Sequence, residues 1–320
     1  MPADRLATSL CGIQFRNPVL AASGTFGYGL EFASLLDLNE LGGIVTKGLS
    51  REPIAGNAPP RLWPTEAGMI NSVGLQNVGV RAFVREKLPK LKQYSVPVIA
   101  NVFGYKPEDY LEVIRVLEDT EGIAGYELNV SCPNTDEGGI FFSSDPRLLA
   151  DVVARVRSTA MRALWVKLSP NVARIEPLAR AAEDAGADAI SLVNTFVGLA
   201  ADVETHTSRI GNGFGGLSGP AIRPIASRMV REASQAVKIP LIGMGGITNG
   251  ASAAEFLLAG ATAVEVGTAT FIDPRAPVLI SRQLDALLAA HGISHVSALI
   301  GALHLRAATA PAACPSVSAQ

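Results

Sequence analysis

Short apolar runs alternate with longer amphipathic segments along most of the chain. Eight runs have the length and the residue types of buried strands, namely residues 18–23, 43–47, 96–103, 125–131, 163–169, 189–195, 239–245 and 263–268. Because they are apolar at nearly every position, they predict strands of a parallel sheet that is covered on both faces. Eight such strands favour a closed (β/α)₈ TIM barrel over an open sheet.

Helical spacing of apolar residues fills several of the intervals between these runs. The predicted helices cover residues 107–120, a segment opened by Asp145 and Pro146, then 175–185, 222–236, 252–258 and 277–290. Asp145 is a typical N-cap, and Gly260 is a typical C-cap. We expect a single domain over residues 1–306, followed by a disordered tail rich in Ala, Pro and Ser at 307–320.

Two connections, residues 48–95 and 196–238, are too long for a plain barrel and are rich in polar residues, Gly and Pro. Insertions on this fold usually form the rim of the active site, at the C-terminal face of the strands. We therefore expect a barrel with insertions at that face.

Composition narrows the function classes. The 320 residues carry a net charge of −2, so no basic field points to nucleic acid. Three widely spaced cysteines argue against a disulfide framework and against a metal or iron–sulfur motif in this chain, and they favour a reduced, cytoplasmic setting. No apolar run reaches the roughly 18 residues of a membrane span, and the N-terminus lacks the apolar region of a signal peptide.

Polar side chains collect where the predicted strands end, and no Asp or Glu is counted among them. Lys47 and Lys167, together with several amides, predict a pocket for a planar anion such as a flavin, whose reduced ring an ammonium stabilises. The Gly-Met-Gly-Gly-Ile sequence (243–247) and Gly267-Thr268 predict a phosphate-binding end formed by backbone N–H groups, although tight turns favour the same residues.

Cys132 follows the fourth predicted strand in a loop of Gly, Asp and Asn. A thiol at a strand end is a candidate base or nucleophile, and a half-buried structural cysteine fits this stretch equally well when it is taken alone. The Gly-x-Gly-x-x-Gly sequence at 211–216 follows a polar stretch and precedes no immediate helix, so it is rejected as a dinucleotide fingerprint.

Five motifs in order carry a resemblance to a known family. They are Asn-Ser-Val-Gly-Leu-Gln-Asn (71–77), Asn-Val-Ser-Cys-Pro-Asn (129–134), Lys-Leu-Ser-Pro-Asn (167–171), Gly-Gly-Leu-Ser-Gly-Pro (215–220) and Gly-Met-Gly-Gly-Ile (243–247). The chain resembles soluble dihydroorotate dehydrogenases in register from about residue 18 to residue 271. The Asp-Glu-Gly-Gly loop (136–139) and the Leu-Ser-Gly-Pro stretch (217–220) are most similar to class 1B, the NAD-linked catalytic subunit.

The resemblance implies oxidation of (S)-dihydroorotate to orotate in pyrimidine biosynthesis. Cys132 is then the base that removes the C5 proton, while a hydride passes from C6 to N5 of FMN. The implied substrate-binding residues are Lys47, Asn71, Val73, Gly74, Leu75, Asn129, Asn194 and Thr195. The implied cofactor-binding residues are Ser23, Lys47, Gly48, Asn101, Asn129, Lys167, Val193, Gly219, Gly245, Gly246, Gly267 and Thr268.

The same resemblance implies a homodimer and a heterotetramer with an electron-transfer subunit, on which FAD and a 2Fe–2S cluster pass electrons to NAD. Pro133, Gly138 and Gly139 suit a lid that closes over the substrate. The alternatives are a fumarate-linked class 1A enzyme, an FMN-dependent dihydropyrimidine dehydrogenase, and a flavin-binding partner protein without turnover.

Overall fold

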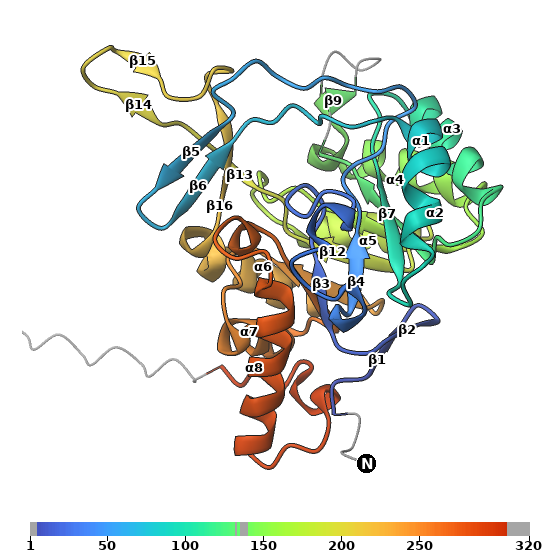
Figure 1. The fold of residues 1–320 in the computed structure, drawn as a ribbon, viewed down its shortest axis with the longest axis vertical. Coiled ribbons are helices and arrows are strands. Elements are labelled where there is room, and N and C mark those ends of the chain that lie inside the picture. Colours follow the sequence, from blue (N-terminus) through green and yellow to red (C-terminus); the bar gives the residue numbers. More distant parts are fainter. Residues whose placement is uncertain (1–4, 132, 135–139, 306–320) are drawn as a thin grey trace, which may run out of the picture.

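Eight parallel strands form a closed barrel in the computed structural model, which describes residues 5–131, 133–134 and 140–305 (Figure 1). Each barrel strand pairs with the barrel strand that precedes it and the one that follows it in the chain. The last one, β18, pairs with the first, β3. All eight predicted runs are confirmed as strands of this barrel. They are β3 (Val19–Ala21), β4 (Gly43–Val45), β7 (Val98–Val102), β8 (Gly125–Asn129), β11 (Ala163–Lys167), β12 (Ala189–Leu192), β17 (Leu241–Met244) and β18 (Ala263–Val266).

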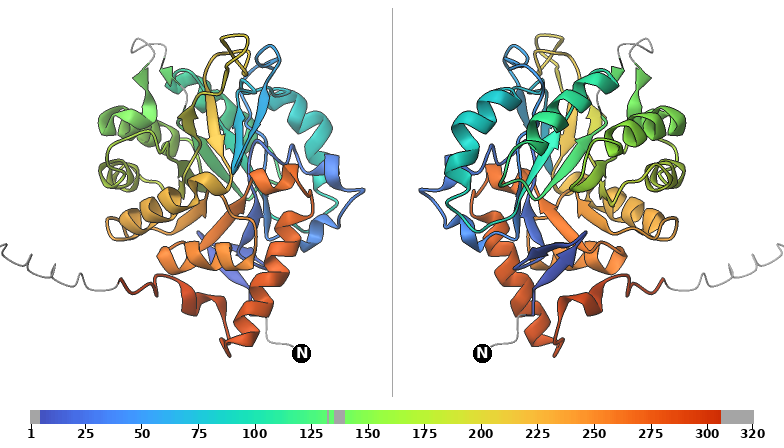
Figure 2. Two further views of the ribbon diagram at one scale, coloured as in Figure 1. Left: turned by 90° about the vertical axis from the view of Figure 1, so that its left-hand side faces the viewer. Right: turned by 90° about the vertical axis from the view of Figure 1, so that its right-hand side faces the viewer.

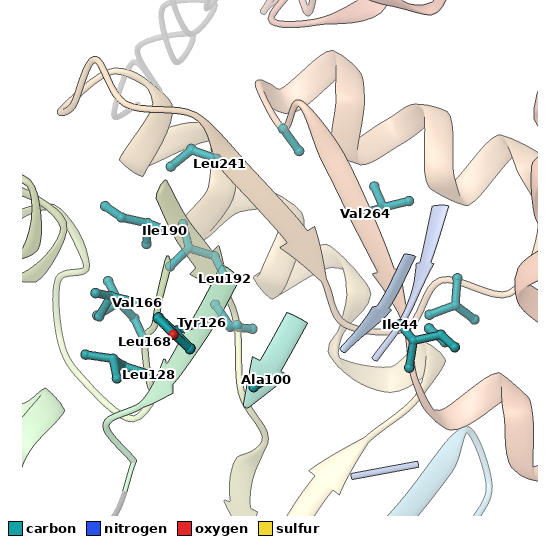
Figure 3. Close-up of a cluster of buried hydrophobic side chains, with 14 of the residues drawn as sticks. Ile44, Ala100, Tyr126, Leu128, Val166, Leu168, Ile190, Leu192, Leu241 and Val264 are labelled. Carbon is teal, nitrogen blue, oxygen red and sulfur yellow. The ribbon is translucent and has the colours of Figure 1, made fainter. Parts of the chain in front are cut away.

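The six predicted helices are also confirmed, and they surround the barrel. Their apolar faces pack on the outward-facing side chains of the strands, such as Tyr126, Val166 and Ile190 (Figure 3). The side chain of Asp145 accepts a hydrogen bond from Arg147 N at 2.7 Å, as expected of an N-cap. The helices are α3 (Pro107–Glu118), α4 (Pro146–Arg157), α5 (Glu176–Asp184), α6 (Arg223–Ser234), α7 (Gly250–Ala259) and α8 (Ala276–Ala290).

One barrel helix lies in the connection 48–95, which was predicted to be an insertion. Residues 80–91 form α1 (Val80–Ala82), the π-helical turn η3 (Phe83–Lys87) and α2 (Leu88–Leu91), with Val80, Phe83, Leu88 and Leu91 buried at helical spacing. Pro89 lacks the N–H that would bond one turn back, which accounts for the widened turn just before it. Only two short 3₁₀ turns, η1 (Leu30–Phe32) and η2 (Leu38–Glu40), separate β3 from β4.

Four strands from the two insertions form a sheet of their own, the rim sheet, with strand order β13-β16-β6-β5. The connection after β4 supplies β5 (Leu62–Thr65) and β6 (Gly68–Asn71), and the connection after β12 supplies β13 (Phe196–Gly198) and β16 (Gly215–Ser218). The two insertions thus meet as antiparallel neighbours, beside the hairpin of β14 (Ala201–Asp202) and β15 (Thr207–Ser208) (Figure 1).

An N-terminal hairpin covers the opposite end of the barrel. It consists of β1 (Thr8–Leu10) and β2 (Ile13–Phe15), far from the rim sheet (Figure 2). Its Leu10 and Phe15 pack against the inward-facing residues of the barrel, which we call the apolar plug: Leu20, Val45, Ile99, Trp165, Ala189, Ile242 and Ala263. None of the helices in the described ranges is both long and apolar enough to cross a membrane.

Candidate active site

A cavity of about 1090 Å³ opens at the C-terminal ends of the barrel strands, beside the rim sheet. It gathers residues from all eight strand ends and from both insertions. Every predicted site residue other than Cys132 lines it: Ser23, Lys47, Gly48, Asn71, Val73, Gly74, Leu75, Asn101, Asn129, Lys167, Val193, Asn194, Thr195, Gly219, Gly245, Gly246, Gly267 and Thr268.

Lys47 supplies a cation to this cavity. Desolvation lowers the pKa of its ammonium, and the nearby Arg61 guanidinium lowers it further. Arg61 is held in place by donating to Gln76 Oε1 at 2.8 Å and to the Ala55 carbonyl at 3.2 Å. In the described part of the chain, no acceptor lies within hydrogen-bond distance of Lys47 Nζ. A small anion in the cavity would give this cation the partner that it lacks.

The loop after β6 approaches the same region with its backbone. Gly74 has φ +74° and Leu75 has φ +54°, so the chain turns sharply here. A Cβ on Gly74 would lie 2.5 Å from Asn57 N, which excludes any other residue at this point. Asn71 Nδ2 donates to the Gly216 carbonyl at 3.1 Å, which ties this loop to β16.

Amide side chains fix the end of β8. Asn194 Nδ2 donates to Ser131 Oγ at 2.9 Å and to Asn129 Oδ1 at 3.3 Å. Ser131 N donates to the same Asn129 oxygen at 3.2 Å, and the Asn129 carbonyl accepts a hydrogen bond from Tyr110 OH at 3.0 Å. Ser131 is therefore held firmly at the cavity wall, one residue before Cys132.

Cys132 itself lies outside the described residues, as do Gly138 and Gly139 of the predicted lid. Around them, the backbone of β9 (Pro133–Asn134) pairs antiparallel with that of β10 (Ile140–Phe141). The turn η4 (Phe142–Ser144) follows, in which Phe142 is buried against Tyr110 with ring centroids 5.8 Å apart.

The cavity floor corrects the expectation that no acid is present among the strand-end residues. Glu127 and Glu265 are 0% and 1% exposed inside the barrel. Lys167 Nζ lies 3.6 Å from Glu127 Oε1 and 3.8 Å from Glu265 Oε2. The two carboxyls are not apparent from the sequence because each stands inside an apolar run, Glu127 two residues before the end of β8 and Glu265 one residue before the end of β18.

Three neutral polar side chains complete this group, which we call the cavity floor: Ser23, Asn101, Glu127, Lys167, Ser191 and Glu265. Lys167 Nζ donates to Ser23 Oγ at 3.1 Å. Asn101 Nδ2 donates to Glu127 Oε1 at 2.5 Å, and Ser23 Oγ donates to the same oxygen at 3.3 Å. Burial alone would lower the pKa of Lys167, but the two carboxyls outweigh that cost and raise it, so Lys167 is an ammonium.

Glycines line the end of the cavity at β17 and β18. Gly245 and Gly246 have φ +125° and +78°. A Cβ on Gly246 would lie 2.7 Å from the Gly219 carbonyl, and a Cβ on Gly219 would lie 2.7 Å from Gly68 Cα. The bare backbone therefore surrounds this end of the cavity, a feature suited to close approach by an anion.

Asn171 has a structural role that its sequence motif did not predict. Its Nδ2 donates to the Thr195 carbonyl at 3.0 Å, and its Oδ1 accepts from Val197 N at 2.9 Å. It joins the end of β11 to the start of the rim sheet and so fixes Thr195 at the cavity wall. The described residues contain no group of three or more His, Cys, Asp or Glu arranged to hold a metal ion.

Fold and cavity together define a (β/α)₈-barrel protein with its polar site at the C-terminal face, where enzymes of this fold carry out catalysis. The family model described as dihydroorotate dehydrogenase matches residues 5–288. The chain belongs to the dihydroorotate dehydrogenase family, and it is an oxidoreductase.

Curated relatives extend over nearly the whole chain. A protein of Solibacter usitatus named "Putative dihydroorotate dehydrogenase A (fumarate)" is 65% identical over 299 residues, 93% of this chain and 98% of the relative. A protein of Geobacter sp. (strain M21) named "Dihydroorotate dehydrogenase B (NAD(+)), catalytic subunit" is 52% identical over 305 residues, 95% of this chain and 100% of the relative. A protein of Citrifermentans bemidjiense with the same name as the latter is also 52% identical. All three relatives are named as dihydroorotate dehydrogenases, and their names differ in the electron acceptor, fumarate or NAD(+).

Proposed function

We propose that this protein oxidises dihydroorotate to orotate with FMN bound in the cavity and Cys132 as the base. The observation that carries the proposal is one cavity that combines the Lys47 cation, a wall of amides, the Lys167 ammonium in its floor and a glycine-lined end. Dihydroorotate has a carboxylate and ring amides, and FMN has a phosphate and a ring that gains charge on reduction. The cavity residues named above include a complementary partner for each of these groups.

The cavity fits FMN at both of its ends. When bound, FMN supplies the acceptor for the hydride. The glycines at 245 and 246 present bare backbone to its phosphate, and they are required there because a Cβ would lie 2.8 Å from Ala226 Cβ or 2.7 Å from the Gly219 carbonyl. Lys167 would hold the ring edge where negative charge develops, together with Ser23 and Asn101.

The substrate residues act through charge and hydrogen bonds. Lys47 binds the carboxylate and so orients the ring, with the backbone around Gly74 closing one side of the site. Asn129 and Asn194 hydrogen-bond to each other at 3.3 Å, and each retains further polar capacity for the ring amides. These contacts fix one orientation of the ring, which is what the transfer from C6 and the proton removal at C5 require.

Cys132 acts as the base on the opposite ring face. Ser131, its described neighbour, is fixed at the cavity wall by Asn129 and Asn194. An ordinary thiol has a pKa of about 8.5, so only a small thiolate fraction exists at neutral pH. Turnover is therefore expected to rise with pH into the alkaline range; a flat profile between about pH 6 and pH 9 contradicts Cys132 as the rate-limiting base.

We infer NAD as the final acceptor, reached through a partner subunit with FAD and a 2Fe–2S cluster, and a homodimer of this chain as the core. The support is the class 1B resemblance and the names of the relatives at 52% identity. Direct reoxidation by fumarate is the second candidate, favoured by the name of the relative at 65% identity. The few, widely spaced cysteines suit a cytoplasmic location.

The activity is tested by mixing the FMN-loaded protein anaerobically with dihydroorotate and recording the flavin spectrum. We expect rapid bleaching, and much slower bleaching with dihydrouracil, which lacks the carboxylate that Lys47 binds. Faster reduction by dihydrouracil supports a dihydropyrimidine dehydrogenase instead. No reduction by either compound leaves only a flavin-binding protein.

The acceptor is tested with the same reduced protein. Reoxidation by fumarate without any partner assigns the fumarate-linked reaction. Resistance to fumarate, together with a subunit carrying FAD and iron–sulfur that co-purifies from the native host and restores NAD reduction, assigns the NAD-linked reaction.

A further inference from the structure

The barrel interior holds two carboxyl groups that the proposed reaction does not use. Glu127 on β8 and Glu265 on β18 form what we call the buried carboxyl pair, and both lie within 4 Å of the Lys167 ammonium. Two carboxylates facing one ammonium would leave an uncompensated negative charge in an interior that is almost fully closed to solvent. Such a charge is strongly unfavourable, so the geometry requires a proton on one of the two acids.

Hydrogen bonds indicate which acid holds the proton. Glu127 Oε1 accepts from both Asn101 and Ser23, and these donors stabilise a carboxylate. Both oxygens of Glu265 lack any hydrogen-bond partner, as do Glu127 Oε2 and the nearby Ser191 Oγ. A carboxylic acid at Glu265 supplies the missing donor, because its O–H can bond to Glu127.

We propose that Glu265 is a neutral acid that shares its proton with Glu127, so that the cavity floor carries no net charge beneath the flavin. The effect of this neutral floor on the flavin rests on the proposed FMN site. The protonation of Glu265 does not depend on that site. Reduction adds negative charge to the ring. Lys167 can stabilise that charge when the floor is neutral, and a second carboxylate would oppose it. Glu127 and Glu265 are therefore positioning residues that act through Lys167.

The electrostatics of the surrounding strands support this assignment. Burial, and next the Glu127 charge, raise the pKa of Glu265 well above its ordinary value. Burial would also raise the pKa of Glu127, but attraction to Lys167 and its hydrogen bonds outweigh it and lower that pKa. The residues paired with Glu265 on β3 and β17, Leu20 and Met244, are uncharged. The pair and Lys167 thus titrate as one unit.

The direct test is infrared spectroscopy of the purified protein at neutral pH. We expect a C=O stretch of a protonated, buried carboxyl in the wild type and its loss in Glu265→Gln, which has nearly the same shape. Glu121→Gln is the matched control, since that side chain is 92% exposed at the surface. This substitution should leave the band of the buried carboxyl unchanged. A wild-type spectrum without such a band overturns the proposal.

The second test is the midpoint potential of bound FMN, measured from about pH 6 to about pH 10. In the wild type, loss of the shared proton at alkaline pH should lower the potential beyond the ordinary flavin dependence. Glu265→Gln should lose this additional fall and match the wild type at neutral pH. Glu127→Gln should raise the potential at neutral pH, because Lys167 then faces no carboxylate.

The outcomes separate this inference from the proposed function. A potential that rises in Glu265→Gln at neutral pH means that Glu265 was ionised, which overturns the inference whatever the activity. If the protein shows the carboxyl band but dihydroorotate does not reduce its flavin, the inference of a shared proton stands and the proposed activity is wrong. The infrared measurement needs neither FMN nor substrate, so it decides the protonation even if a variant at Glu127 does not fold.

Discussion

The inside of the barrel has two levels with opposite chemistry, built on the same strands. At the level of the apolar plug, the inward-facing residues include Ile99, Trp165, Ala189 and Ala263. Two residues further along each of those strands, the same face carries Asn101, Lys167, Ser191 and Glu265. Because side chains alternate across a strand, a step of two residues keeps the direction and changes only the height.

This difference separates stability from chemistry within one fold. The lower level is closed by the β1–β2 hairpin and contains apolar side chains in contact with one another. The upper level holds charges that only each other and a bound ligand can compensate. We therefore expect substitutions at the lower level to change the free energy of unfolding and substitutions at the upper level to change rates, affinity and pH dependence.

The largest expected effect belongs to Cys132, which follows Ser131 in the sequence. Cys132→Ala should reduce the rate of flavin reduction by dihydroorotate by roughly 10²- to 10⁴-fold, the usual contribution of a positioned base. FMN should remain bound, because the proposed cofactor contacts come from other residues. Anaerobic stopped-flow absorbance measures the rate.

Cys11→Ala is the matched control. Burial, and next the Asp188 carboxylate, raise the pKa of the Cys11 thiol to about 11, and its Sγ donates to the Asp188 carbonyl at 3.3 Å. The thiol is therefore protonated and distant from the rim sheet, so the reduction rate should not change. Equal loss of rate in both variants would remove the distinction between the two levels.

The next effect is on stability at the lower level. Trp165 is fully buried and packs near Phe15, with ring centroids 6.3 Å apart. Trp165→Ala should lower the free energy of unfolding by about 3–5 kcal/mol, since it leaves a large cavity in the apolar plug. Urea unfolding of the wild type and the variant measures this. A variant that keeps its stability but loses substrate affinity would place function at the lower level.

A smaller effect concerns substrate affinity. Lys47→Ala should raise KM for dihydroorotate by roughly 10- to 100-fold, because a hydrogen bond to a charged group contributes about 1.5–3 kcal/mol. The affinity for dihydrouracil, which lacks the carboxylate, should stay nearly constant in the same variant. Lys92→Ala, a change in an exposed ion pair with Glu121, is the control. Equal losses for both substrates would mean that Lys47 acts on packing instead of on charge.

The sequence predicted the eight strands and six helices because each buried strand is a continuous apolar run with glycine or proline near it. It did not separate the helix at 80–91 from the insertion before it, since Pro89 and several lysines weaken the pattern there. Residues at the strand ends were found through their polar type. Glu127 and Glu265 were not, because their role depends on contact between β8, β11 and β18, which a pattern along one strand does not contain.

The smallest expected effect is a dependence of stability on pH that arises from Glu265. Its pKa in the folded protein is raised above the value of about 4.5 expected for the unfolded chain. The folded state therefore binds more protons between these two values, and the free energy of unfolding should fall as pH rises through that window.

Urea unfolding at a series of pH values above 4.5, on the wild type and on Glu265→Gln, measures this slope. The variant should be flatter, because glutamine keeps the shape of the neutral acid and has no proton to lose. Trp165→Ala should be far less stable but should retain the wild-type slope of unfolding free energy against pH. The reason is that the apolar plug contains no titratable group. Parallel slopes in the wild type and Glu265→Gln would show that Glu265 contributes no proton linkage, and the difference between the two levels would then be one of polarity alone.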